Sequence, residues 1–207
     1  MSKFLNSMLN VSFGSIRQWH WISASLCMAG MFLFAITGIT LNHAADISST
    51  PTHMSVEGEM PEALMDKWLA DDPQPSSLST ALHLWLQQTQ QVYIPKNAQG
   101  EWDDGELYIG LPRPGGDAWL ALDTETGEFV FEDTDRGWIA FFNDLHKGRD
   151  SGAVWPWFID VFAGGCVIFS LTGLILLWRQ KSGRQSTGPL AALGILIPLV
   201  IILLFLH

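Results

Sequence analysis

One long stretch without charge constrains this chain more than any other feature. Between Arg17 and Asp46 lie 28 residues with no Lys, Arg, Asp or Glu. A helix of about 20 apolar residues crosses the core of a bilayer, and a signal-peptide core has only about 7–15. We therefore expect a retained transmembrane helix over residues 17–43.

Two further hydrophobic stretches predict two more spans. Residues 157–178 carry Asp160 as their only formal charge, and residues 189–207 are almost wholly aliphatic, with Pro198 inside. A membrane helix tolerates an internal proline because neighbouring groups satisfy the freed carbonyl. We expect an α-helical membrane protein with three transmembrane helices. An ionisable residue within a span is a functional candidate, so Asp160 either moves protons or orients a ligand, or it simply reaches the headgroups.

The basic residues predict the orientation. The lead at residues 1–16 and Arg17 carry basic but no acidic side chains, and so does the loop at residues 179–188. Loops rich in Lys and Arg stay in the cytoplasm. The N-terminus is therefore expected in the cytoplasm, with residues 44–156 and the C-terminus on the opposite side.

The region between the first two spans is strongly acidic. From Asp46 to Asp150 it holds 20 acidic and 6 basic residues. This charge excludes nucleic acid as a partner. It fits a domain that meets cations or basic partners, but equally a solvated acidic surface.

Periodicity in the same region predicts a small folded domain. A helical pattern covers residues 76–91, and alternating strands separated by turns cover residues 107–111, 118–122 and 128–132. We expect an extracytoplasmic α+β domain at residues 44–136, followed by an interfacial segment at residues 137–156 with a helix over Gly137–His146. A domain of this size buries only a modest core, which favours support from the membrane part or from a second copy, as in a homodimer.

The cysteines and the missing motifs narrow the chemistry. Cys27 and Cys166 both lie within predicted spans, and the sequence contains no C-x-x-C-H motif. Covalent c-type haem is therefore excluded. Nucleotide-binding glycine motifs are also missing, so any electrons would come from a membrane quinol or a redox partner.

Three histidines lie near predicted membrane surfaces. His20 precedes His43 by 23 residues, about 35 Å along a helix, so the two do not ligate one iron. His43 and His146 flank the acidic domain on the outer side, where they would be the two axial ligands of a low-spin haem. Lys147 and Arg149 would bind its propionates. His20 finds no inner partner in this chain and would need a second subunit or another ligand.

The alternative for each of these histidines is a hydrated interfacial side chain. A short repeat is also present, since Phe34–Ile39 resembles Phe169–Leu174 and each segment lies late in its span. The repeat predicts an inverted pair of helices, in which Thr-Gly dipeptides allow close helix or cofactor approach. Two ordinary membrane helices that use common residues are the alternative.

These residues resemble the PepSY-associated transmembrane (PepSY_TM-like) family. The first helix, with Arg17-x-x-His20-Trp21 and a Thr-Gly-Ile-Thr-Leu-Asn-His run ending at His43, resembles the first signature of the family. Asp144–Arg149 followed by Leu171–Trp178 resembles the second, and residues 120–128 resemble the closing hairpin of a PepSY domain.

The resemblance implies a bacterial inner-membrane protein with a PepSY-like periplasmic domain. Larger relatives include haem-containing reductases of ferric siderophores, so it implies non-covalent haem b at His43 and His146, and also at His20. Electrons would pass to periplasmic ferric iron or a ferric chelate, as in a ferric (siderophore) reductase that supports iron uptake. This chain has fewer spans and histidines than the larger relatives. The alternatives are a non-catalytic, membrane-anchored module that regulates a partner and an accessory subunit of a transporter.

Overall fold

The computed structural model describes residues 14–70, 72–180 and 186–206. Most of the predicted lead at residues 1–16, the centre of the loop at residues 179–188 and His207 lie outside this set. The chain divides into two compact units. The helical unit comprises residues 1–33 and 157–207, and the sheet unit comprises residues 34–156.

Three long helices carry the apolar stretches. α2 covers Ile16–Asn42, α6 covers Val154–Arg179 and α7 covers Thr187–Phe205. Their 27, 26 and 19 residues exceed the roughly 17 that the shortest transmembrane helices need. Their most apolar windows have mean hydropathies of 2.0, 2.2 and 2.6. The three predicted spans are therefore present as helices of membrane-spanning length and composition.

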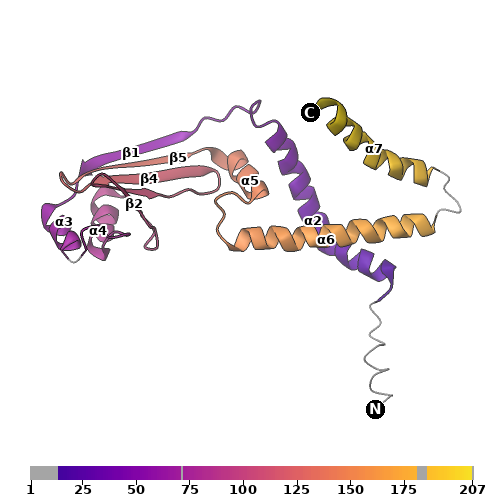
Figure 1. The fold of residues 1–207 in the computed structure, drawn as a ribbon, viewed down its shortest axis with the longest axis horizontal. Coiled ribbons are helices and arrows are strands. Elements are labelled where there is room, and N and C mark those ends of the chain that lie inside the picture. The colour runs from indigo at the N-terminus through magenta and orange to yellow at the C-terminus, as the bar shows by residue number, and fades with distance from the viewer. Residues whose placement is uncertain (1–13, 71, 181–185, 207) are drawn as a thin grey trace, which may run out of the picture. The chain divides into compact units, whose positions relative to one another are not determined.

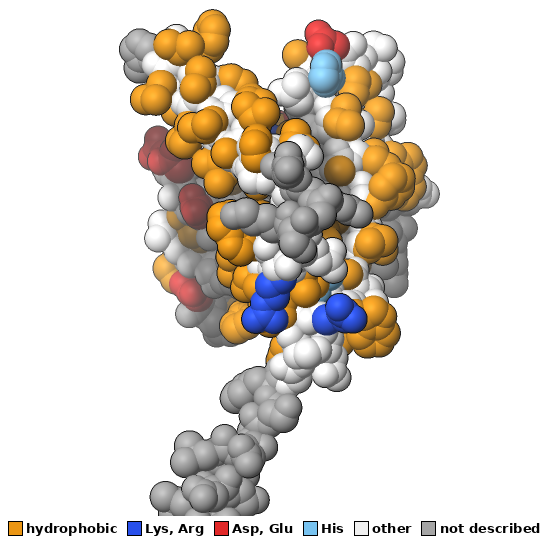
Figure 2. Space-filling view, turned by 90° about the vertical axis from the view of Figure 1, so that its right-hand side faces the viewer, with side chains coloured by type: hydrophobic (Ala, Val, Ile, Leu, Met, Phe, Trp, Pro, Cys, Tyr) orange, Lys and Arg blue, Asp and Glu red, His pale blue; other side chains and the backbone are white. Residues whose placement is uncertain are grey.

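The outer surfaces of these helices are apolar. No residue of α6 or α7 is buried within the chain. From the side drawn in Figure 2, hydrophobic side chains cover most of the visible helix surface. Water disfavours such a surface by about 25 cal/mol for each Å². Lipid removes that cost, and the protein is a multi-pass membrane protein.

The sheet unit contains one five-stranded antiparallel sheet in the order β1-β5-β4-β3-β2. Figure 1 shows β1, β5 and β4 running side by side. The strand bounds are Thr52–Glu59 for β1, Glu101–Asp103 for β2, Glu106–Gly110 for β3, Gly116–Asp123 for β4 and Glu128–Asp135 for β5.

The core of the sheet unit lies between one face of the sheet and two short helices, α3 (Glu62–Leu69) and α4 (Thr80–Trp85). Alternate residues of the three central strands point into it, because side chains alternate faces along a strand. Leu107, Leu120 and Leu122 are fully buried there. The α+β architecture predicted from periodicity is thus observed.

Two edge strands were not predicted. β1 is mostly polar and exposed, yet each of its eight residues pairs with a residue of β5. Its sequence shows no clear apolar alternation, so the pairing comes from the neighbouring strand rather than from local pattern. β2 has three residues and, among the described strands, pairs with β3 alone.

The helix predicted at residues 76–91 is shorter and irregular. It begins after Ser79, whose hydroxyl accepts a hydrogen bond from the backbone N–H of Leu82 at 3.3 Å. Beyond Trp85 it continues as a π-helix, Leu86–Gln90, and ends at Gln91 with a φ of 59°. The helix predicted at Gly137–His146 is α5, Gly137–Lys147.

Candidate histidine sites

His146 lies in α5, which a buried carboxylate ties to the sheet. Asp144 is only 4% exposed. Its Oδ2 accepts hydrogen bonds from the backbone N–H of Gly115 at 2.9 Å and from the guanidinium of Arg136 at 2.7 Å. A Cβ at Gly115 would lie 2.7 Å from Phe141. Only glycine allows this approach between α5 and the β3–β4 turn, and the approach positions His146.

The His146 ring lies against the last third of α2. Its Nδ1 is 2.7 Å from the hydroxyl of Thr37, and its ring centroid is 5.0 Å from that of Phe34, with the two planes at 46°. A Cβ at Gly38 would lie 3.6 Å from the ring, which is ordinary contact. We call these four residues of the sheet unit the His146 cluster.

The hydrogen bonds of the Thr37 hydroxyl favour one tautomer of His146. That hydroxyl donates its single proton to the carbonyl of Phe34 at 3.1 Å. With the proton on that carbonyl, the hydroxyl accepts from His146, which is the tautomer with the hydrogen on Nδ1 and the lone pair on Nε2. Nε2 makes no hydrogen bond with any residue that the structure describes. Metal-ligating histidines hold this state by donating Nδ1–H to an oxygen.

His20 has a matching environment in the helical unit. Its Nδ1 is 3.1 Å from the hydroxyl of Thr172 and 3.2 Å from the carbonyl of Phe169. The His20 ring stacks on the Phe169 ring at 4.8 Å and 11°, and a Cβ at Gly173 would lie 3.1 Å from it. We call these four residues the His20 cluster.

His43 has a different setting from the other two. It follows the last residue of α2 and is exposed, and its Nδ1 is 3.0 Å from the carbonyl of Ile39, one turn earlier. Among the described residues, no hydrogen bond or ring contact joins His43 to His146. The pairing of these two histidines across one haem therefore stays a prediction.

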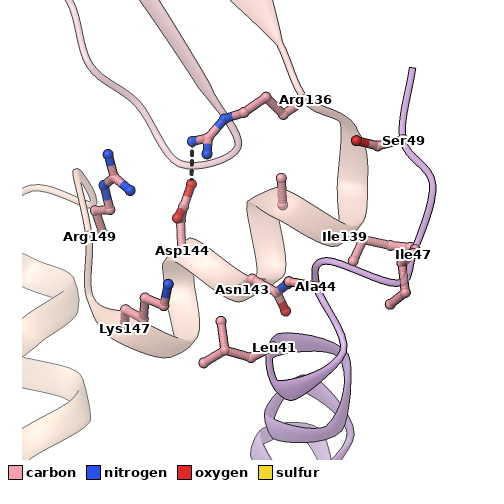
Figure 3. A pocket seen from close by; sticks show the side chains of 11 residues that line it. Leu41, Ala44, Ile47, Ser49, Arg136, Ile139, Asn143, Asp144, Lys147 and Arg149 are labelled. Carbon is pink, nitrogen blue, oxygen red and sulfur yellow. Dashed lines mark hydrogen bonds and ion pairs between the residues drawn. The ribbon is translucent and has the colours of Figure 1, made fainter. Parts of the chain in front are cut away.

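Lys147 and Arg149 line a small pocket of mixed polar and apolar lining between the end of α2 and α5 (Figure 3). Its volume is about 230 Å³, and its wall includes the Arg136–Asp144 ion pair. Arg149 also forms an ion pair with Asp150 at 3.2 Å. Pockets for drug-sized ligands hold roughly 300–1,000 Å³, so this one is smaller than such a site.

The remaining described histidines and Asp160 lie apart from these clusters. His53, on β1, is exposed and bonds the hydroxyl of Thr134 at 3.0 Å. His83, on α4, has a buried Nε2 with no hydrogen-bond partner in the described part of the chain. Asp160 lies exposed in the second turn of α6.

Sequence reasoning missed the roles of Thr37 and Thr172. Their hydroxyls bond the imidazoles, whereas the repeat that contains both predicted only a close approach of helices or a cofactor. The signal was the spacing Phe-x-x-Thr-Gly, which places an aromatic ring and a hydroxyl on one face of a helix.

Comparison with known protein families finds a matching family model. The model of a family described as putative PepSY_TM-like matches residues 11–207. Neither the curated proteins nor the solved structures contain a match. The family model covers three long apolar helices, an antiparallel sheet and both histidine clusters. This chain therefore belongs to the putative PepSY_TM-like family.

Proposed function

We propose that this protein is a b-type haem membrane protein that passes electrons to ferric iron or ferric chelates in the periplasm and so supports iron uptake. The observation that carries the proposal is the bond from His146 Nδ1 to the hydroxyl of Thr37. It leaves Nε2 as a lone-pair donor, the state in which imidazole binds iron. When bound, haem b supplies a reversible one-electron couple.

Three imidazoles have a suitable donor state. In His20, His43 and His146, Nδ1 meets an oxygen, and Nε2 has no hydrogen-bond partner among the residues described. We assign His43 and His146 as the axial ligands of a haem near the periplasmic surface. His20 would ligate a second haem, with its other ligand supplied by a second copy of the chain in a homodimer.

The basic pocket supports the placement of the propionates. Lys147 and Arg149 bring two cationic groups to its wall. A volume of about 230 Å³ is too small for a whole macrocycle, so the pocket would receive the charged edge of haem, not its ring. Charge-assisted bonds to carboxylates are about twice as strong as neutral ones.

The proposal includes a direction for electron flow. The N-terminus and the loop between α6 and α7 would face the cytoplasm of a bacterial inner membrane, since their flanks are basic. A quinol in the lipid, or a redox partner, would donate electrons, and the acidic residues between the first two spans would attract ferric cations.

A visible spectrum of the full chain, purified from haem-sufficient membranes, tests the proposal. We expect a reduced b-type α-band that is lowered in His146→Ala and in His43→Ala, because each substitution removes a ligand of the same haem. Reduced protein should be reoxidised on addition of ferric citrate.

His53→Ala is the matched control, since His53 is exposed on β1 and lies in neither cluster. It should keep the band at full height. A well-folded preparation that is colourless despite haem supply, or a band of unchanged height in both ligand substitutions, would sink the proposal.

A further inference from the structure

The repeated motif Phe-x-x-Thr-Gly holds a histidine from elsewhere in the chain in both clusters. In the sheet unit, Phe34 and Thr37 contact His146, which comes from α5. In the helical unit, Phe169 and Thr172 contact His20, which comes from α2. Each copy of the repeat thus contacts one histidine through its phenylalanine and its threonine.

The direction of the hydrogen bonds is the same in both clusters. Thr172 donates its hydroxyl proton within α6, with the carbonyls of Ile168 at 2.7 Å and Phe169 at 3.0 Å as acceptors. Thr37 donates to Phe34 within α2. Because a hydroxyl has only one proton, each threonine oxygen is left as an acceptor for Nδ1–H.

Glycine next to each threonine lets the ring approach the helix. A Cβ at Gly173 would lie 3.1 Å from His20 and one at Gly38 would lie 3.6 Å from His146. The first distance is tighter than ordinary van der Waals contact, so His20 needs its glycine more than His146 does.

We propose that Phe-x-x-Thr-Gly is a histidine-positioning motif used twice, in which Thr37 and Thr172 hold His146 and His20 in the Nδ1–H tautomer and leave both Nε2 atoms as lone-pair donors. Thr37 and Thr172 are positioning residues in this role. The inference rests on hydrogen bonds and not on haem, so it stands or fails separately from the proposed function. It gives His20, like His146, an Nε2 lone pair that can bind a metal centre or take up a proton.

The two clusters differ in how many oxygen atoms can accept a hydrogen bond from the histidine Nδ1. His20 Nδ1 also reaches the carbonyl of Phe169 at 3.2 Å, so a second acceptor remains when the hydroxyl of Thr172 is removed. His146 has Thr37 as its only acceptor among the described residues. The tautomer of His146 should therefore depend on one hydroxyl, and that of His20 on two oxygens.

The test is ¹⁵N NMR of the haem-free full chain, labelled on histidine and reconstituted in bilayers. The spectra are recorded at pH 8, and the ring nitrogen shifts of a neutral imidazole report its tautomer. His146→Gln and His20→Gln assign the signals by their loss. We expect the Nδ1–H form to predominate at both rings in the unmodified chain.

Thr37→Val should turn His146 from mainly Nδ1–H to mainly Nε2–H, the form that free histidine prefers, and Thr37→Ser should restore Nδ1–H. Thr172→Val should leave His20 mainly Nδ1–H. Thr40→Val is the matched control, because the Thr40 hydroxyl bonds Asn143 and the carbonyl of Thr37 but not an imidazole. A predominant Nε2–H form at His146 in the unmodified chain, no change in Thr37→Val, or no rescue by serine would overturn the inference.

Discussion

The His146 cluster and the His20 cluster are built from the same residue types but have different supports. His146 is carried by α5, which Asp144 ties to the β3–β4 turn through Gly115 and Arg136. His20 lies within α2, and its cluster belongs to the helical unit. The difference teaches that one site depends on the fold of the antiparallel sheet, whereas the other depends on helix packing.

Removal of the carboxylate of Asp144 should separate the two clusters most strongly. Asp144→Ala leaves the Gly115 N–H without its acceptor and removes the charge partner of Arg136, whose side chain is 35% exposed. We expect a loss of about 2–3 kcal/mol in unfolding free energy of the sheet unit, with the NMR signals of His20 unchanged. Asp117→Ala, at an exposed residue of β4, is the control. Equal changes in the NMR signals of His146 and His20 would contradict the separate supports of the two clusters.

The two threonines should differ in their effect on haem affinity. Loss of an oxygen that orients a ligating histidine typically weakens metal affinity about 10–100-fold. We expect Thr37→Val to fall in this range and Thr172→Val to weaken haem binding less than about tenfold, since the carbonyl of Phe169 still accepts from His20. Haem titration of the haem-free chain measures both. A larger effect of Thr172→Val would reverse the ranking.

The two glycines should differ in stability. Alanine in place of glycine inside a helix gains up to about 1 kcal/mol. Gly38→Ala should realise part of this gain, because its Cβ would meet His146 at 3.6 Å. Gly173→Ala should not, because the His20 ring at 3.1 Å would have to shift. Thermal unfolding in detergent, with the NMR position of each ring as the second reading, checks the pair. Identical shifts at both sites would count against the close packing of His20.

The smallest effect should appear at acidic pH and only in the sheet unit. Backbone N–H groups of Thr126 and Glu125 hold the pKa of Asp123 below its usual range at the β4–β5 turn. The stabilisation is present above the unfolded pKa of about 3.9 and is lost as pH falls through the lower folded value. Asp123→Asn should therefore flatten the acid limb of the stability curve slightly and leave the His20 cluster unaffected. If the unmodified chain and Asp123→Asn have the same dependence of stability on pH, Asp123 does not contribute to acid stability.

Much of the architecture was predictable because it depends on composition and period. The charge-free stretch, the aliphatic third span and the alternation of β3, β4 and β5 each have a local sequence signal. β1 was missed because its polar residues are ordered by pairing with β5. The π-helix at Leu86–Gln90 has no comparable local signature.

The sites were only partly predictable for the same reason. The positions of His20, His43 and His146 near the span ends follow from hydropathy. The bonds of Thr37 and Thr172 depend on which helix face meets which ring, and that is decided by packing between segments distant in sequence. His43 was paired with His146 by topology alone, whereas the contacts of His146 are with Thr37, Phe34 and Gly38.

The haem content per chain tests the central proposal most directly, namely that His146 and His20 each ligate a haem. The α-band of the reduced, purified protein, divided by chain concentration, measures it for the unmodified chain, His146→Ala, His20→Ala and His53→Ala. We predict that each of the first two substitutions lowers the haem content, while His53→Ala leaves it unchanged. Equal haem content in all four proteins would contradict the account.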